Sequence, residues 1–286
     1  AFPFFVKPVK ATYSILARRV EDFADLRKLL AFGLLETQIL KKLVQPCNEL
    51  MRSHADLRIY ALHLVGEELV PGVQVTLDGF VDKGEITILG IVDSVMYPGT
   101  NAFERFEYPS RLPQNVQARM QRMATDLVRA LDLRHGAFNV EFFYDETTGR
   151  IAFLEINPRV AYQFADLYEK VDGFNLYDIV LALGLGETPQ VRRGQGAYRH
   201  AASFVLRDFA GNALTAHPSD AELARVRAQY DDARVLIYVK RGASLAREMK
   251  WLGSYRYAVF NLGGSSVDEL HSRYRSVRSQ LRFSFH

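Results

Sequence analysis

Two glutamates and an asparagine stand at spacings that would place them on one face of a β-hairpin. The segment 138–159 consists of two strand-like runs around a polar turn: Phe138–Tyr144, Arg150–Ile156, and DETTG between them, with Gly149 available for a positive φ. If the hairpin folds about its middle, Glu141 lies directly opposite Glu155. Side chains in a strand alternate between faces, so Asn157 shares the face of Glu155. The pattern therefore predicts a cluster of three oxygen-bearing side chains.

This cluster has the chemistry of a site for a hard metal ion. Like charges opposite one another on paired strands are destabilising, and a cation between them reverses the effect. Two carboxylates and an amide oxygen form an all-oxygen set that suits Mg²⁺, with waters and phosphate oxygens completing the coordination. Arg159 follows Asn157 by two residues and could hold a phosphate or carboxylate bidentately. The alternative is an ordinary surface hairpin whose glutamates are solvated.

Two further segments make the pattern more specific. The chain opens with an apolar strand, a lysine and a serine-containing loop, FPFFVKPVKATYSILARRV (2–20), and later carries an acidic linker within HLVGEELVPGVQVTLDGF (63–80). A lysine strand, an EELVPG linker and a terminal EINPR, in that order, resemble the ATP-grasp superfamily. Within it the chain is most similar to carboxylate–amine ligases, including those that join amino acids, and more distantly to biotin carboxylase.

The resemblance implies roles for the lysine strand and its loop. Lys7 would neutralise the α- or β-phosphate of ATP as a compact cation. Lys10 and Ser14 would lie in the loop that folds over the phosphates. In the superfamily this loop is usually rich in glycine, so that backbone N–H groups can approach the anion, but here it reads KATYS. This departure leaves open whether the loop supports full phosphoryl transfer. Without the resemblance, Lys7 would simply end a core strand with its amine in water.

The resemblance also implies a nucleotide hinge and a catalytic arginine. The run Glu67-Glu68-Leu69-Val70 resembles the hinge that holds adenine, and Gln74 falls where many relatives carry a ribose-binding glutamate. The amide of Gln74 could still bond a hydroxyl. Arg159 would hold the transferred phosphate or the acyl phosphate formed from it. By itself, the hinge segment would be an ordinary strand end with a Pro-Gly turn.

Composition excludes several classes of protein. The chain has 286 residues, 48% hydrophobic and 24% charged, which is ordinary for a soluble globular protein. No stretch approaches the length of a transmembrane span. The net charge is only +3 and the basic residues are dispersed, which argues against a nucleic-acid-binding protein. Cys47 is the only cysteine, so there is no intrachain disulfide, and residence in the cytoplasm is the simplest interpretation.

The resemblance implies an α/β ATP-grasp fold made of α+β lobes, and the strand and helix patterns indicate where the lobes end. We expect a small lobe over residues 1–60, a larger lobe with the metal hairpin over 61–190, and a C-terminal α+β lobe over 191–286, with ATP between the first two. The pattern predicts that Pro46 breaks a helix that begins near Leu34. It also predicts that 101–113 is a long polar and aromatic loop that could line a site.

The resulting hypothesis is an ATP-dependent, ADP-forming carboxylate–amine ligase that works through an acyl phosphate, with Mg²⁺ or Mn²⁺. The expected partners are a small-molecule carboxylate and an amine, with a homodimer left open, and neither nucleic acid nor a membrane. A biotin-carboxylase-like enzyme and a non-catalytic nucleotide-binding regulator are the alternatives. Since Ala1 begins directly at the lysine strand, we also expect that the chain lacks the domain that precedes this strand in the superfamily.

Overall fold

The computed structural model describes residues 2–9, 17–31, 33–54, 63–212, 214–240 and 254–286. By their contacts, these residues form two compact units, one reaching to Val70 and the other starting at Pro71. Each unit has its own core and is described by itself. The expected division into three lobes, near residues 60 and 190, stays a prediction. In the second unit one sheet continues past residue 190.

The first unit contains a small antiparallel sheet and two helices. Its elements are β1 (Phe4–Pro8), β2 (Arg18–Val20), α1 (Phe23–Leu30), α2 (Leu34–His54) and β3 (Leu64–Glu67). The strand order is β2-β1-β3, and Val6, Val20 and Leu29 form the buried core. Asp22 begins α1 by accepting hydrogen bonds from the backbone N–H groups of Ala24 and Asp25.

The predicted helix break at Pro46 is wrong, because α2 runs through Pro46 to His54. Proline removes one backbone donor and crowds the preceding turn, which can kink a helix without ending it.

The second unit is built on one eight-stranded antiparallel sheet. Its strands are β4 (Val73–Asp82), β5 (Glu85–Met96), β6 (Phe103–Tyr108), β7 (Gly136–Tyr144), β8 (Ile151–Asn157), β9 (His200–Asp208), β11 (Arg234–Ile237) and β12 (Tyr255–Gly264). They stand in the order β11-β12-β9-β6-β5-β4-β7-β8. The remaining elements are α3 (Gln114–Ala130), η1 (Tyr162–Phe164), α4 (Ala165–Asp172), α5 (Leu176–Gly184), α6 (Asp220–Gln229), α7 (Val267–Gln280) and a small ribbon of β10 (Leu214–Ala216) with β13 (Ser284–Phe285).

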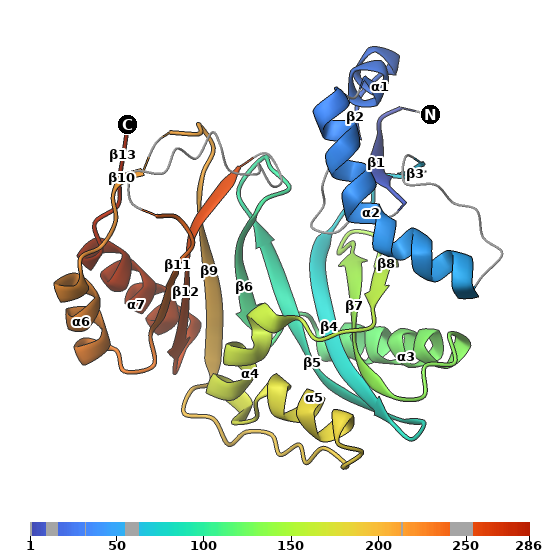
Figure 1. Cartoon of the computed structure of the whole chain (residues 1–286). Helices are drawn as coiled ribbons and strands as arrows, with labels where there is room; N and C mark the ends of the chain where they lie inside the picture. The colour runs from blue at the N-terminus through green and yellow to red at the C-terminus, as the bar shows by residue number, and fades with distance from the viewer. Residues whose placement is uncertain (1, 10–16, 32, 55–62, 213, 241–253) are drawn as a thin grey trace. The chain divides into compact units, whose positions relative to one another are not determined.

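Helices cover both faces of this sheet (Figure 1). The α4 and α5 helices pack on one face, in a core that includes Phe80 and Tyr168. The α3 helix lies on the opposite face at the β4–β7 end, against Leu77 and Phe138. The α6 and α7 helices lie on that same opposite face near β9 and β12. Alternate residues of each strand therefore enter different cores, as the two-residue period of a strand requires.

Two segments of this sheet can be compared with the sequence predictions. The β4–β5 hairpin turns at Lys83-Gly84, as the sequence predicts, and both residues have positive φ, 52° and 90°. The predicted loop 101–113 is wrong in its centre, because Phe103–Tyr108 forms β6. This strand lies between β5 and β9 in the middle of the sheet. From Arg105 onward charged and aromatic residues alternate, which fits a strand that has an apolar core on one face and ion pairs on the other.

Candidate functional site

The β7–β8 hairpin forms with the predicted register. Glu141 is paired directly with Glu155, and Asn139 with Asn157. A bulge follows the glutamate pair, between Glu141 and Phe142, and the second strand begins at Ile151, one residue later than expected. Gly149 closes the turn with a φ of 68°, a conformation that glycine adopts without steric cost.

Strand β4 adds a second row of polar residues to the same sheet face. It pairs with β7 so that Thr76 lies opposite Glu141 and Asp78 opposite Asn139. Gln74 completes the row and donates a hydrogen bond from Nε2 to Glu141 Oε2 over 2.7 Å. All three β4 residues are buried. Burying a row of polar side chains beside two opposed glutamates costs free energy, and the stability of the fold does not require it.

The Glu141 carboxyl has a strongly perturbed proton affinity. Burial, followed by the charge of Glu155, raises the pKa of Glu141 to about 7, whereas the hydrogen bond from Gln74 and the charge of Arg159 oppose the rise. The pair therefore holds a proton near neutral pH when no cation is present. A divalent cation would compete for the same oxygens.

A chain of side-chain amides continues from the glutamates to Arg159. Asn157 donates from Nδ2 to Glu155 Oε1 and to Asn139 Oδ1, both over 3.1 Å. Asn139 donates from its own Nδ2 to the backbone carbonyl of Arg159 over 2.9 Å. The Arg159 guanidinium lies toward the oxygen of Asn157, with Nη2 at 3.5 Å from Oδ1. The structure thus brings together the predicted metal ligands and the predicted catalytic arginine.

Asp78 and Tyr168 belong to this region, although the sequence analysis did not identify them. The Tyr168 hydroxyl donates to Asp78 Oδ2 over 2.9 Å, and both side chains are buried. Burial raises the pKa of Asp78 to about 7, while the hydrogen bond from Tyr168 opposes the rise. An acidic residue in the middle of an apolar strand, as in TLDGF, was the available signal. It could not show that α4 would supply a partner.

The residues present fit a divalent cation of the magnesium type. Among the described residues, no group of three or more histidine, cysteine, aspartate and glutamate side chains is placed to hold a metal. The ligand set that the sequence predicts, the glutamate pair with the Asn157 amide, stays a prediction; it would leave positions for waters and phosphate oxygens. That is how Mg²⁺ is usually held beside a nucleotide.

The nucleotide residues predicted in the first unit have a separate geometry. Lys7 on β1 and Glu67 on β3 form an ion pair of 2.9 Å. Glu68 is exposed, and Leu69 and Val70 are half-buried. Lys10 and Ser14 lie outside the described residues. Gln74 contacts Glu141 in the second unit, so its expected bond to ribose stays a prediction, as does phosphate binding by Lys7.

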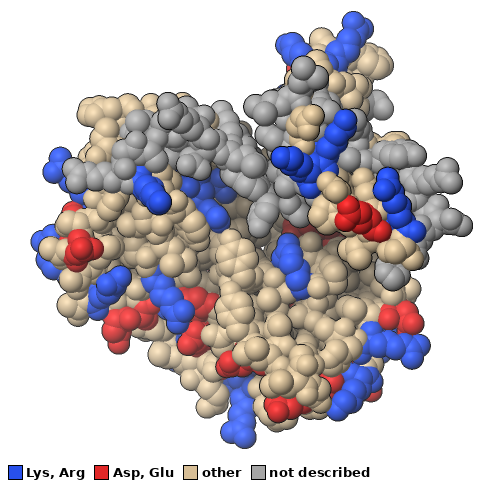
Figure 2. Space-filling view, viewed as in Figure 1, with Lys and Arg blue, Asp and Glu red and all other residues tan. Residues whose placement is uncertain are grey.

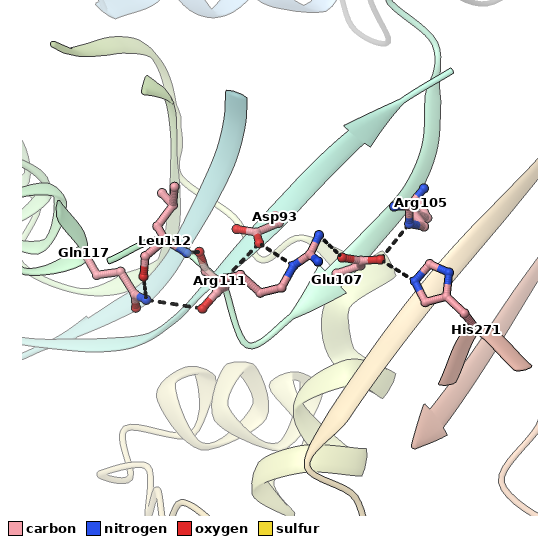
Figure 3. A network of polar contacts seen from close by, with 8 residues as sticks. Asp93, Arg105, Glu107, Arg111, Leu112, Gln117 and His271 are labelled. Atoms are coloured by element: carbon pink, nitrogen blue, oxygen red, sulfur yellow. Dashed lines mark hydrogen bonds and ion pairs between the residues drawn. The ribbon is translucent and has the colours of Figure 1, made fainter. Parts of the chain in front are cut away.

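A second polar network lies on the opposite sheet face and has a structural explanation (Figure 3). Glu107 on β6 accepts hydrogen bonds from Arg105 Nε and His271 Nε2 and pairs with Arg111 Nη2, at 2.6, 2.9 and 2.9 Å. The Arg111 backbone N–H also donates to Asp93 Oδ2. These hydrogen bonds and ion pairs hold the Glu107 carboxyl as an anion, and its pKa is lowered despite burial. The network joins β5, β6 and α7 between two apolar cores.

On the face shown in Figure 2, acidic and basic side chains of the described residues are interspersed, in agreement with the small net charge. No helix in the described part of the chain combines the length and apolar character needed to cross a membrane.

Comparison with known proteins identifies the family and the fold. Residues 1–167 match the model of a family described as "ATP-grasp domain". The crystal structure of L-amino acid ligase from Bacillus licheniformis superposes with a TM-score of 0.70 at 17% identity, covering 100% of this chain and 64% of that chain.

Two curated proteins match shorter segments. D-alanine–D-alanine ligase of Acidiphilium cryptum is 36% identical over 97 residues, 32% of each chain. Carnosine synthase 1 of Gallus gallus is 33% identical over 128 residues, 43% of this chain and 13% of that protein. The chain thus spans less than two thirds of the length of each of these relatives. Because the matched model covers more than half of the sequence and the fold agrees, the chain belongs to the ATP-grasp domain family.

Proposed function

We propose that this protein is an ATP-dependent ligase that joins a small-molecule carboxylate to an amine and releases ADP and phosphate. The observation that carries the proposal is the direct pairing of Glu141 with Glu155, with Asn157 and Arg159 beside them. Two carboxylates held against each other, where burial and their mutual repulsion raise the pKa of Glu141 despite the charge of Arg159, are suited to a cation–phosphate ligand. The names of the relatives support the ligase class.

The chemistry assigned to this site is phosphoryl transfer followed by amide formation. The substrate carboxylate attacks the γ-phosphate of ATP and gives an acyl phosphate with release of ADP. The amine then displaces phosphate and forms the amide. Magnesium, when bound, would neutralise phosphate charge and align the transferred group. The contribution of the chain is positioning and electrostatics.

Each residue has a definite part in that positioning. Glu141, Glu155 and Asn157 would hold the cation, and Gln74 fixes one oxygen of Glu141 through its hydrogen bond. Arg159 would neutralise charge on the transferred phosphoryl group. Its backbone is tied to β7 by Asn139, so the guanidinium starts from a fixed point. Such pre-organisation lowers the cost of ordering the site when substrate binds.

The test is an ADP-release assay across a pool of amino acids and other small carboxylates with amines. We expect turnover that depends on both an acid and an amine and is lost in Glu155→Gln. Glu146→Gln, the same substitution on the exposed turn of the same hairpin, is the matched control and should retain turnover. Turnover that requires bicarbonate and biotin would assign the carboxylase alternative. ATP binding without turnover for any pair would assign the regulatory alternative.

A further inference from the structure

Two buried polar residues on neighbouring strands both bind the part of the chain that follows the metal hairpin. Asp78 on β4 and Asn139 on β7 lie directly opposite each other in the antiparallel register. Their exposed fractions are only 1% and 2%. Residues that are opposite one another on paired strands point to the same face of the sheet. Because water does not reach these two side chains, their hydrogen-bond partners must come from the elements packed on that face.

Both partners belong to the segment 159–168. Asn139 donates from Nδ2 to the backbone carbonyl of Arg159 over 2.9 Å. Asp78 accepts from the hydroxyl of Tyr168 on α4, also over 2.9 Å, and the Tyr168 side chain is fully buried. Between these two contacts, the backbone N–H of Ala161 is directed at the same Asp78 carboxyl. The paired strands therefore hold this segment at both of its ends.

We propose that Asp78 is a positioning residue for Arg159, because together with Asn139 it forms a two-point anchor that fixes the segment 159–168 on the sheet. The part played by Arg159 in turnover rests on the proposed function, whereas the anchor itself does not depend on it. Asp78 is too deeply buried to contact a substrate. It acts through Tyr168, by tying α4 to the strand that pairs with the metal hairpin.

The anchor is held in place at a cost. Burial raises the pKa of Asp78 to about 7, and the hydrogen bonds from Tyr168 and Ala161 and the charge of Arg159 oppose the rise. An apolar side chain would fill this position without the cost of burying a carboxyl. Without Asp78, the segment would be held only at the Arg159 carbonyl and could pivot there. Displacement of a catalytic charge by about 1 Å can lower a rate by about a hundredfold.

The test of the anchor is amide hydrogen exchange of the segment 159–168 in the full chain, measured by mass spectrometry of proteolytic fragments. Asp78→Leu, made together with Tyr168→Phe so that no buried hydroxyl loses its partner, should speed this exchange by about tenfold. Asp78→Asn keeps an acceptor for Tyr168 and should exchange at nearly the wild-type rate. Asp82→Leu is the matched control, because Asp82 is also buried on β4 but accepts from Thr188, outside this segment. Exchange that is unchanged in the double variant, or equally fast in the control, would overturn the inference.

Turnover separates an action through Arg159 from a general loss of stability. The double variant should lower kcat by about tenfold or more with little change in KM for ATP. In an Arg159→Ala background the same two substitutions should have little further effect, and an equal loss in both backgrounds would refute positioning. If the wild type turns over no pair of acid and amine, the proposed function fails, and the exchange measurement still decides whether the anchor exists.

Discussion

Binding of a divalent metal to this chain should depend steeply on pH near neutrality. The cause is Glu141, whose pKa burial and Glu155 raise to about 7. A metal ion needs the ionised carboxylate, so binding below pH 7 must release the proton that the pair holds. Affinity should therefore rise with pH up to about 7 and level off above it.

The magnitude follows from the two pKa values. With a pKa of about 7, the fraction of ionised Glu141 grows about a hundredfold between pH 5 and pH 8, or ~2.7 kcal/mol of binding free energy. With the ordinary value of 4.5, the same change of pH would alter the affinity by less than about twofold. The two cases are easily distinguished. In Glu155→Gln the repulsion between the two carboxylates is absent, so the pH at which the affinity levels off should be lower, while the affinity itself falls.

The assay is a titration with Mn²⁺ alone between pH 5 and pH 8.5, because the phosphates of ATP have their own pKa near 6. Calorimetry in two buffers of different ionisation enthalpy would count the protons released, which should approach one at pH 6 and vanish above pH 8. The Glu146→Gln protein serves as the control for changes in hairpin charge. An affinity that stays constant from pH 5.5 to pH 8 would refute the reasoning, because Glu141 would then not be a proton-holding ligand.

Three further outcomes test other residues. Asp78→Asn should stabilise the fold at pH 8. Because the pKa of Asp78 is raised to about 7 in the folded state, its protonated carboxyl stabilises the fold fully below about pH 4. This contribution is lost as the pH rises through about 7, by up to ~4 kcal/mol. Urea unfolding at pH 4, 6 and 8 measures this, and an unchanged pH slope would contradict it. Lys7→Ala should weaken binding of ATP and ADP more than binding of adenosine, and Lys42→Ala, at an exposed lysine, is the control. If Lys7→Ala lowers Tm but weakens all three ligands equally, the ion pair of Lys7 with Glu67 is purely structural. Arg159→Ala should lower turnover by roughly a hundredfold with a smaller change in ATP affinity, because its charge acts where phosphoryl charge develops; steady-state kinetics that show only a raised KM would argue against this.

Much of the hairpin could be predicted because its register is a local property. The distance from Glu141 to Glu155 along the chain, the alternation of apolar residues and the glycine in the turn all lie within one continuous segment. The same local logic predicted the turn at Lys83-Gly84. It failed for β6, a short strand that lies between the preceding strand β5 and β9, which is distant in sequence.

The sequence by itself determined the paired glutamates, the asparagine and the arginine on one segment, and the order of motifs of an ATP-grasp protein. Only the tertiary structure decided what surrounds them. Gln74 and Asp78 reach the hairpin because β4 pairs with β7 across more than fifty residues of chain. Asn139 contacts both Asn157 and the backbone carbonyl of Arg159, because the register of β7 and β8 places it opposite Asn157. Periodicity reports which face a side chain takes, but the partner on that face depends on which strands and helices pack together.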